Sequence, residues 1–84
     1  MCHTYILYSA TRDRYYIGST NNLDRRLREH NSGHTKSTRS GKPWDLVFSK
    51  KFDSPVEAHR FEFSIKRQKS RRYIQSLIEG DQPG

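Results

Sequence analysis

Two runs of aromatic and aliphatic residues near the start of the chain constrain its fold more than any other feature. Residues 3–10 and residues 14–19 carry the Tyr and Ile side chains that favour β-strands. Residues 11–13 between them, Thr-Arg-Asp, are polar and typical of a turn. The chain therefore predicts a β-hairpin, whose register decides which side chains share a face.

Two tyrosines of this hairpin, Tyr5 and Tyr16, are eleven residues apart. If the numbers of paired residues sum to an odd value near 21, the two tyrosines lie opposite each other on one face, and Gly18 leaves room beside them. The alternative is that both are ordinary core aromatics of the two strands.

A first helix is predicted directly after the hairpin. Residues 20–22, Thr-Asn-Asn, are candidate N-caps. Leu23 and Leu27 are one turn apart on the face that packs inward. Gly33 is the residue type favoured just past a C-terminus, so we expect the helix to end there.

The next segment predicts a loop and then a strand. Residues 34–43 are rich in Ser, Thr, Gly, Lys and Arg, which predicts a mobile basic loop without an element of its own. Residues 44–52 predict a third strand, in which Trp44, Leu46 and Phe48 alternate.

A capping box predicts a second helix near the end of the chain. Ser54 is the cap, Pro55 takes the first helical position, and Glu57 completes the box. This helix should run to about Gln68 with Ala58, Phe61 and Ile65 inward, and Ser70 should begin a short third helix carrying Tyr73, Ile74, Leu77 and Ile78. We therefore expect one α+β domain at residues 1–80, a three-stranded antiparallel sheet flanked by helices, and a disordered tail at residues 81–84.

The charge of the chain indicates a polyanionic partner. Lys and Arg number 16 against 9 Asp and Glu, which gives a net charge of +7. Such a charge attracts nucleic acid first and acidic membranes second. The alternative is a merely soluble basic surface.

The cysteine content and the hydropathy indicate a location. Cys2 is the only cysteine, so we expect no disulfide within the chain and a cytoplasmic protein. We see no apolar run of transmembrane length and no signal peptide. Cys2 and His3 lack the regularly spaced four-ligand set that zinc requires, so we expect no structural zinc.

An ordered set of polar residues runs through most of the chain. Tyr5-Ile6-Leu7 and Tyr16-Ile17-Gly18 are followed by Asn22-Leu23-Asp24-Arg25-Arg26, by His30 and by Glu62. Their order and spacing resemble the GIY-YIG nuclease family, and in particular its small stand-alone members of the UPF0213 type. The resemblance implies a DNA endonuclease whose catalytic residues are Tyr5, Tyr16, Arg26, His30 and Glu62.

The resemblance gives Glu62 the role of metal ligand. Ala58, Glu62 and Lys66 match the family's A-x-x-x-E-x-x-x-K helix, and Glu62 would hold a single Mg²⁺ or Mn²⁺ ion. The alternative from spacing alone is a surface glutamate paired with Lys66 one turn later.

The family's N-L-x-x-R pattern places the catalytic arginine on Arg26, with Arg25 as a supporting cation. An arginine can donate two parallel hydrogen bonds to phosphate oxygens. His30, four residues on, is expected to contact phosphate or water. The alternatives are a solvated arginine and a histidine whose hydrogen bonds are satisfied at a helix end.

The two tyrosines are candidates for deprotonating the attacking water. A phenol has a pKa near 10 and is a poor base unless nearby cations lower that value. We expect Tyr5 to be the better candidate and Tyr16 to be its positioning partner.

The chain departs from the family pattern in two places. Tyr5-Ile6-Leu7 stands where Gly-Ile-Tyr is expected, although the distance to Tyr16 is kept. No asparagine follows Asn31, so a late active-site asparagine is absent or replaced by Gln68 or Gln75. Further similarity to the stand-alone subgroup is carried by Gly33, Thr35, Ser37, Thr38 and Trp44.

Basic residues outside the motif are expected to contact the nucleic acid backbone without reading sequence. The alternative is a solvated helix face and an ordinary polar loop. The residues expected to bind nucleic acid are Arg25, Lys36, Arg39, Lys42, Lys66, Arg67, Lys69, Arg71 and Arg72.

The function expected from these features is metal-dependent cleavage of DNA, single-stranded or branched, with weak sequence preference, in DNA repair or processing. Two alternatives stay open. One is a nucleic-acid-binding module of the same fold without turnover. The other is a catalytic subunit that needs a protein partner for specificity.

Overall fold

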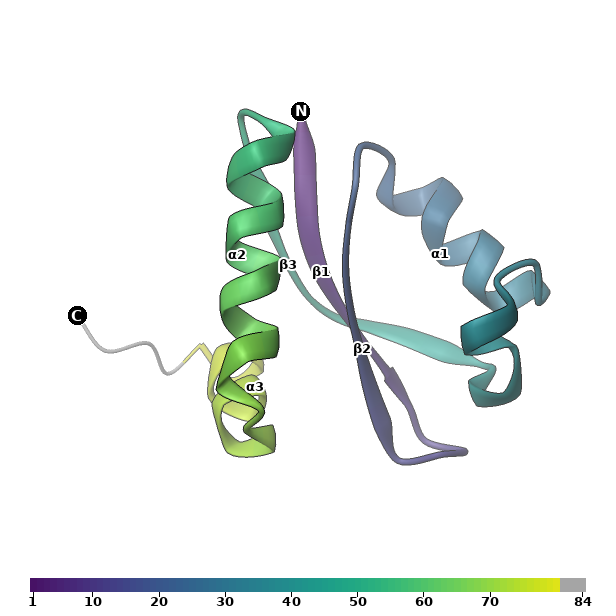
Figure 1. Cartoon of the computed structure of the whole chain (residues 1–84). Helices are drawn as coiled ribbons and strands as arrows, with labels where there is room; N and C mark the ends of the chain where they lie inside the picture. The colour runs from purple at the N-terminus through teal and green to yellow at the C-terminus, as the bar shows by residue number, and fades with distance from the viewer. Residues whose placement is uncertain (81–84) are drawn as a thin grey trace.

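The computed structural model describes residues 1–80, and the tail expected at residues 81–84 lies outside them. Three strands and their helices follow each other along the chain (Figure 1). The elements are β1 (Cys2–Ser9), β2 (Arg14–Thr20), α1 (Leu23–Ser32), the 3₁₀ helix η1 (Lys36–Gly41), β3 (Trp44–Phe52), α2 (Pro55–Gln68) and α3 (Arg71–Ile78).

The antiparallel sheet has the order β2-β1-β3 and helices on both faces. Tyr5 and Leu7 of β1 face α1, where Leu23 and Leu27 pack against them. Ile6 faces the other side and packs with residues of α2 and α3. Figure 1 shows α1 and α2 on opposite sides of the strands. The expected α+β fold class is confirmed.

The hairpin register differs from the one considered above. Tyr5 pairs with Gly18, and Tyr16 pairs with Leu7, so the paired numbers sum to 23. The cause lies in the turn, because Ser9 is the last paired residue and Asp13 takes a positive φ of 52°. The two tyrosines therefore lie diagonally on one face, with a ring-centroid distance of 6.3 Å.

The alternation expected in β3 is interrupted by a bulge. Ile6 pairs with Phe48, whereas the next residue, Leu7, pairs with Leu46. The extra residue turns Trp44 toward Tyr5 and Leu7, while Phe48 packs on the α2 face. Leu46 is left 40% exposed. The alternation expected over Trp44, Leu46 and Phe48 is therefore broken at this bulge.

The helix caps agree with the sequence. Asn22 accepts from the Arg25 N–H at the start of α1, and Gly33 ends this helix in the left-handed region at φ 85°. Ser54 accepts from the Glu57 N–H, and Ser70 accepts from the Tyr73 N–H.

The segment expected to be a loop without an element contains η1 at Lys36–Gly41. Two contacts of Thr38 hold η1 in place. Its buried hydroxyl lies 2.8 Å from Nδ1 of His30, and its carbonyl accepts from the indole Nε1 of Trp44 at 2.8 Å. Composition predicts a loop here because neither contact is visible in local sequence.

None of the helices within residues 1–80 is both long and apolar enough to cross a membrane.

Candidate active site

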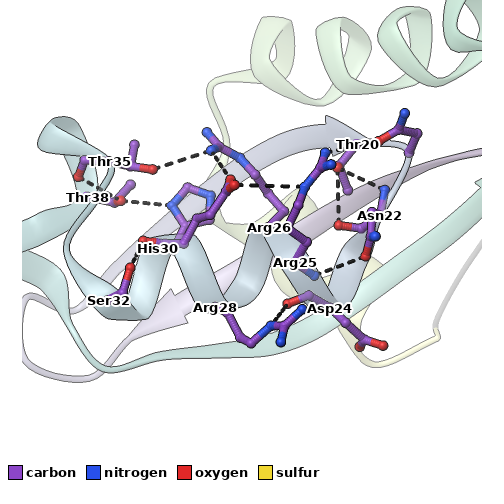
Figure 2. A network of polar contacts seen from close by, with 12 residues as sticks. Thr20, Asn22, Asp24, Arg25, Arg26, Arg28, His30, Ser32, Thr35 and Thr38 are labelled. Carbon is purple, nitrogen blue, oxygen red and sulfur yellow. Dashed lines mark hydrogen bonds and ion pairs between the residues drawn. The ribbon is translucent and has the colours of Figure 1, made fainter.

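A chain of three side chains runs beneath the sheet on the α1 side. The Tyr5 hydroxyl of β1 lies 3.1 Å from Nε2 of His30 in α1. Nδ1 of the same ring lies 2.8 Å from Oγ1 of Thr38 in η1, as Figure 2 shows. All three side chains are buried, with Tyr5 1%, His30 0% and Thr38 2% exposed. A strand, a helix and a 3₁₀ helix thus meet at one histidine.

The hydrogen bonds fix the direction of the protons along this chain. The Thr38 hydroxyl lies 3.3 Å from the Thr35 carbonyl, which can only accept, so Thr38 donates there. Its oxygen is then free to accept from the N–H at Nδ1 of His30. Nε2 carries the lone pair in this tautomer and accepts the Tyr5 O–H.

Burial keeps Tyr5 and His30, the two titratable groups of this hydrogen-bonded series, neutral. Burial lowers the pKa of His30 to about 4, and the neighbouring Arg26 charge adds to this effect. Burial raises the pKa of Tyr5 to about 12, although Arg26 opposes the shift. At neutral pH, His30 is an unprotonated acceptor and Tyr5 is a donor.

The partly exposed side chain of Arg26 lies beside the phenols of Tyr5 and Tyr16. Its Nη1 donates to Oε1 of Glu29 at 3.0 Å and to Oγ1 of Thr35 at 3.4 Å (Figure 2). Partial burial lowers its pKa, but the bonds with Glu29 and with the phenols of Tyr5 and Tyr16 outweigh burial and raise it. The guanidinium therefore stays charged beside both phenols.

Gly18 makes room for the Tyr5 hydroxyl. A Cβ at Gly18 would lie 2.6 Å from that oxygen and 3.1 Å from the ring of Tyr16. The Tyr16 ring is half-buried and meets the His30 ring edge-on at 4.7 Å between centroids. The glycine opposite Tyr5 is therefore required by packing.

Glu62 lies on α2, on the other side of the edge strand β2. Its Oε1 accepts from Oγ of Ser19 at 2.7 Å, and its Oε2 accepts from Nζ of Lys66 at 2.7 Å. Burial would raise the pKa of this carboxyl, but the bonds from Lys66 and Ser19 prevail and lower it. The i,i+4 pair with Lys66, which spacing alone predicts, is present.

The donor set at Glu62 suits a magnesium-type ion that keeps water ligands. Within residues 1–80, no three His, Cys, Asp or Glu residues come together as a ready-made metal cage. Two titratable groups adjoin the carboxylate of Glu62: Nζ of Lys66 lies 2.7 Å from Oε2, and Nδ1 of His59 lies 3.5 Å from Oε1. Mg²⁺ commonly binds through one or two carboxylates, several waters and substrate phosphate. One carboxylate next to a hollow lined by its neighbours Ser19 and His59 fits that pattern.

Two of the predicted catalytic residues, Arg26 and Tyr16, each line a hollow. One, of about 470 Å³, lies between α1 and α2 and is lined by Arg25, Arg26, Ser19 and His59 among others. The other, of about 260 Å³, is lined by Tyr16 and Thr38 with Arg12 and Arg14. The structure thus brings Tyr5, Tyr16, Arg26 and His30 together, whereas Glu62 lies on α2 and is held by Ser19 of β2.

The basic residues predicted to bind nucleic acid have different surroundings. Arg25 borders the larger hollow. Arg39 donates to the Gly33 carbonyl at the end of α1. Arg71 forms an ion pair with Asp13 and lies over the Tyr15 ring, so it joins α3 to the hairpin. All members of the set are exposed: Arg25, Lys36, Arg39, Lys42, Lys66, Arg67, Lys69, Arg71 and Arg72.

Three supporting residues have roles that sequence reasoning did not assign. Thr38 orients His30, and Ser19 orients Glu62. Asn31 clamps the start of β3, accepting from the Trp44 N–H at 2.6 Å and donating to its carbonyl at 3.1 Å. Thr38 was part of the family resemblance, whereas Ser19 and Asn31 gave no signal beyond their polarity. Gln68 and Gln75, the expected substitutes for a late asparagine, are both exposed.

Comparisons with known proteins agree with the class that the fold and the site define, a nuclease domain of α+β architecture. The model of the GIY-YIG catalytic domain matches residues 1–75, which is most of the chain. The chain belongs to the GIY-YIG nuclease family.

Several relatives extend over nearly the whole chain. A UPF0213 protein of Halobacterium salinarum is 40% identical over 79 residues, covering 93% of this chain and 100% of the relative. The solution NMR structure of a UPF0213 protein from Bacillus halodurans superposes with a TM-score of 0.57 at 35% identity, covering 94% of this chain and 84% of that one. The structure-specific endonuclease subunit SLX1 of Mus musculus is 42% identical over 77 residues, which are 81% of this chain but only 28% of SLX1.

Proposed function

We propose that this protein is an endonuclease that hydrolyses DNA phosphodiester bonds, with a preference for single-stranded or branched DNA, weak sequence preference and a role in DNA repair or processing. The observation that carries the proposal is the buried chain from Thr38 through His30 to Tyr5, which ends beside the Arg26 guanidinium. The net charge of +7 supports a polyanionic substrate. The similarity to SLX1, named a structure-specific endonuclease subunit, supports the preference for branched DNA.

In this mechanism His30 accepts the proton of the attacking water through Tyr5, and the negative charge that develops on the phosphate offsets the low pKa of the buried imidazole. A phenol whose pKa is raised to about 12 holds its own proton at neutral pH and cannot act as a base by itself. When water gives a proton to the Tyr5 oxygen, Tyr5 passes its own proton to Nε2 of His30, and the resulting hydroxide attacks phosphorus. Tyr16 orients the water or the phosphate, since its ring lies against both partners.

Arg26 stabilises the charge that develops on the phosphate oxygens. Its side chain is held by Glu29 and Thr35, so it is pre-positioned before substrate arrives. Arg25, on the same side of the hollow, holds the flanking backbone.

Glu62 would hold a single Mg²⁺ or Mn²⁺ ion, with Ser19 orienting the carboxylate. A bound divalent cation supplies Lewis-acid stabilisation of charge on the phosphate and the leaving oxygen. Lys66, whose side chain is 51% exposed, is free to move from Glu62 to a substrate phosphate.

The test is a panel of labelled single-stranded, duplex and branched DNA incubated with the purified protein in Mg²⁺, in Mn²⁺ and in EDTA. We expect cleavage in either metal, none in EDTA, and none with Glu62→Ala, which should still bind DNA. Asp45→Asn, on the exposed surface of β3, is the matched control and should cut normally. Binding without cleavage under all conditions would favour a module without turnover. Cleavage restored by a protein partner would favour an incomplete catalytic subunit.

The single cysteine, Cys2, is consistent with a reducing compartment, and a cytoplasmic location is part of this proposal.

A further inference from the structure

The side of α2 that faces away from the sheet carries exposed apolar side chains. Val56 is 58% exposed and Phe63 is 62% exposed, whereas Ala58 and Ile65 of the same helix are buried. Residues seven positions apart share one face of a helix. We call this surface the outer face of α2, a hollow of about 600 Å³ lined by Val56, His59, Arg60, Phe63, Ser64 and Arg67.

Two arginines share this outer face with the exposed aromatic ring. Cζ of Arg67 lies 6.0 Å from the centroid of the Phe63 ring, within the range of a cation–π contact. Arg60 lines the same hollow. An apolar protein surface docked here would bury both guanidinium groups without a counter-charge, which is costly. A nucleotide presents the flat face of a base for the ring and an anionic phosphate for the arginines, so it complements both features.

The outer face of α2 is continuous with the candidate active site. His59 lines this hollow and also the hollow that contains Arg25 and Arg26. Nδ1 of His59 lies 3.5 Å from Oε1 of Glu62. Glu62 and Phe63 are consecutive residues of α2, so they project about 100° apart around the helix axis. A DNA strand with its cleaved phosphate near Glu62 therefore has its adjacent nucleotides close to Phe63.

On the basis of the proposed endonuclease function, we propose that Phe63 is a stacking platform for an unpaired base beside the cleaved phosphate, and that Arg60 and Arg67 contact the neighbouring phosphates. Bases stack on exposed aromatic rings in proteins that bind single strands. A base inside a duplex already has both faces covered. The substrate class assigned by this surface is DNA with unpaired nucleotides next to the bond that is cut.

The test measures binding in EDTA, where no cleavage is expected, using a single-stranded oligonucleotide that carries 2-aminopurine and the duplex of the same sequence. Phe63→Leu should weaken single-strand binding about 10-fold, because it keeps an apolar side chain but removes the stacking surface. It should also abolish the fluorescence change of the 2-aminopurine base on binding. Phe63→Tyr keeps a ring and should behave like the parent protein. Val56→Ala, an apolar change on the same face, and duplex binding are the matched controls and should be unaffected.

Equal single-strand affinity of Phe63→Leu and the parent protein would overturn the proposal. A concentration-dependent dimer in light scattering that Phe63→Leu dissolves would also overturn it, since the face would then serve a second copy. The experiment distinguishes a failure of the stacking platform from a failure of the proposed endonuclease function. Cleavage by a protein whose binding ignores Phe63 contradicts only the stacking platform. A ring-dependent fluorescence change without cleavage in any metal contradicts only the endonuclease.

Discussion

The hydroxyl of Tyr5 lies 3.1 Å from Nε2 of His30, and both side chains are buried on the α1 side of the sheet. The motif tyrosine therefore has a proton acceptor in place before any substrate arrives. Its ring is accommodated because the paired residue on β2 is Gly18. The buried histidine, which spacing alone could assign to a helix end, connects this tyrosine to η1 through Thr38.

The two tyrosines should differ in their contributions to rate. Tyr5→Phe removes the hydroxyl that lies at Nε2 of His30 and passes the proton in this mechanism, so the single-turnover cleavage rate should fall at least 100-fold. Tyr16→Phe should cause a smaller loss, because it removes an orienting group. Phe keeps the ring and its packing, and melting temperatures check this. Normal cleavage by both variants, with unchanged melting, would mean that the tyrosines are core aromatics.

Thr38→Val should impair both stability and cleavage although Thr38 contacts no substrate in this scheme. The substitution keeps the volume but leaves the buried Nδ1–H of His30 without an acceptor, at a cost of about 1–3 kcal/mol in unfolding free energy. The other His30 tautomer then becomes accessible, and it cannot accept from Tyr5. Thr38→Ser restores the hydroxyl and should restore the rate. Denaturant unfolding and single-turnover cleavage provide the two measurements. A Thr38→Val enzyme with normal rate and stability would show that the tautomer is not held by Thr38.

Stability should decline as the pH falls from 6.5 toward 4. His30 has a pKa of about 4 in the folded chain against 6.5 as its ordinary value, so the unfolded chain binds more protons in this window. The stabilisation is complete above pH 6.5 and amounts to about 3 kcal/mol there. The carboxyls of Glu29 and Glu62, whose pKa values are lowered from 4.5, contribute to the loss only below about pH 5.

Urea unfolding at pH 7, 6 and 5 measures this dependence. His30→Gln should lower stability at pH 7 and flatten the curve between pH 7 and 5. A parent protein whose unfolding free energy is constant from pH 7 to pH 4.5 would show that His30 is not held neutral by burial.

The sequence predicts the elements of this fold well because their signals are local. The caps Ser54 and Ser70 and the terminal Gly33 are each followed or preceded by the expected helix. The features that sequence reasoning missed depend on turn geometry and on contacts between neighbouring elements. The hairpin register depends on a turn that begins one residue earlier than expected, and η1 depends on the hydrogen bond from Trp44. Local composition contains neither kind of information.

The same distinction applies to the site. Tyr5, Tyr16, Arg26 and His30 come together as the motif predicts, whereas their catalytic roles stay predictions. The partner of Glu62, Ser19, is 43 residues away in sequence, so no spacing rule could find it.

DNA binding should depend steeply on salt. If about five phosphates are neutralised, the log–log slope on duplex should be roughly −4, and somewhat smaller on single strands. Lys69→Ala and Arg72→Ala should each flatten the slope by about 1 without moving the cleavage positions. Arg71→Ala should instead lower stability, because Arg71 pairs with Asp13 and covers Tyr15. Fluorescence anisotropy between 50 and 300 mM salt provides the measurement. Salt-independent binding, or cleavage confined to one short sequence, would indicate direct base readout by residues 34–43.

The most direct test of the proposed active site compares two adjacent arginines on the DNA that the substrate panel shows to be cut. Arg26 lies beside both phenols, whereas Arg25 pairs with Asn21 and Glu29 at the rim. Single-turnover rates at saturating protein separate chemistry from affinity. Arg26→Ala should lower the rate constant at least 100-fold with little change in the dissociation constant, and Arg25→Ala should weaken binding with a nearly normal rate constant. Equal and small effects of the two substitutions would contradict the assignment of this site to phosphodiester hydrolysis.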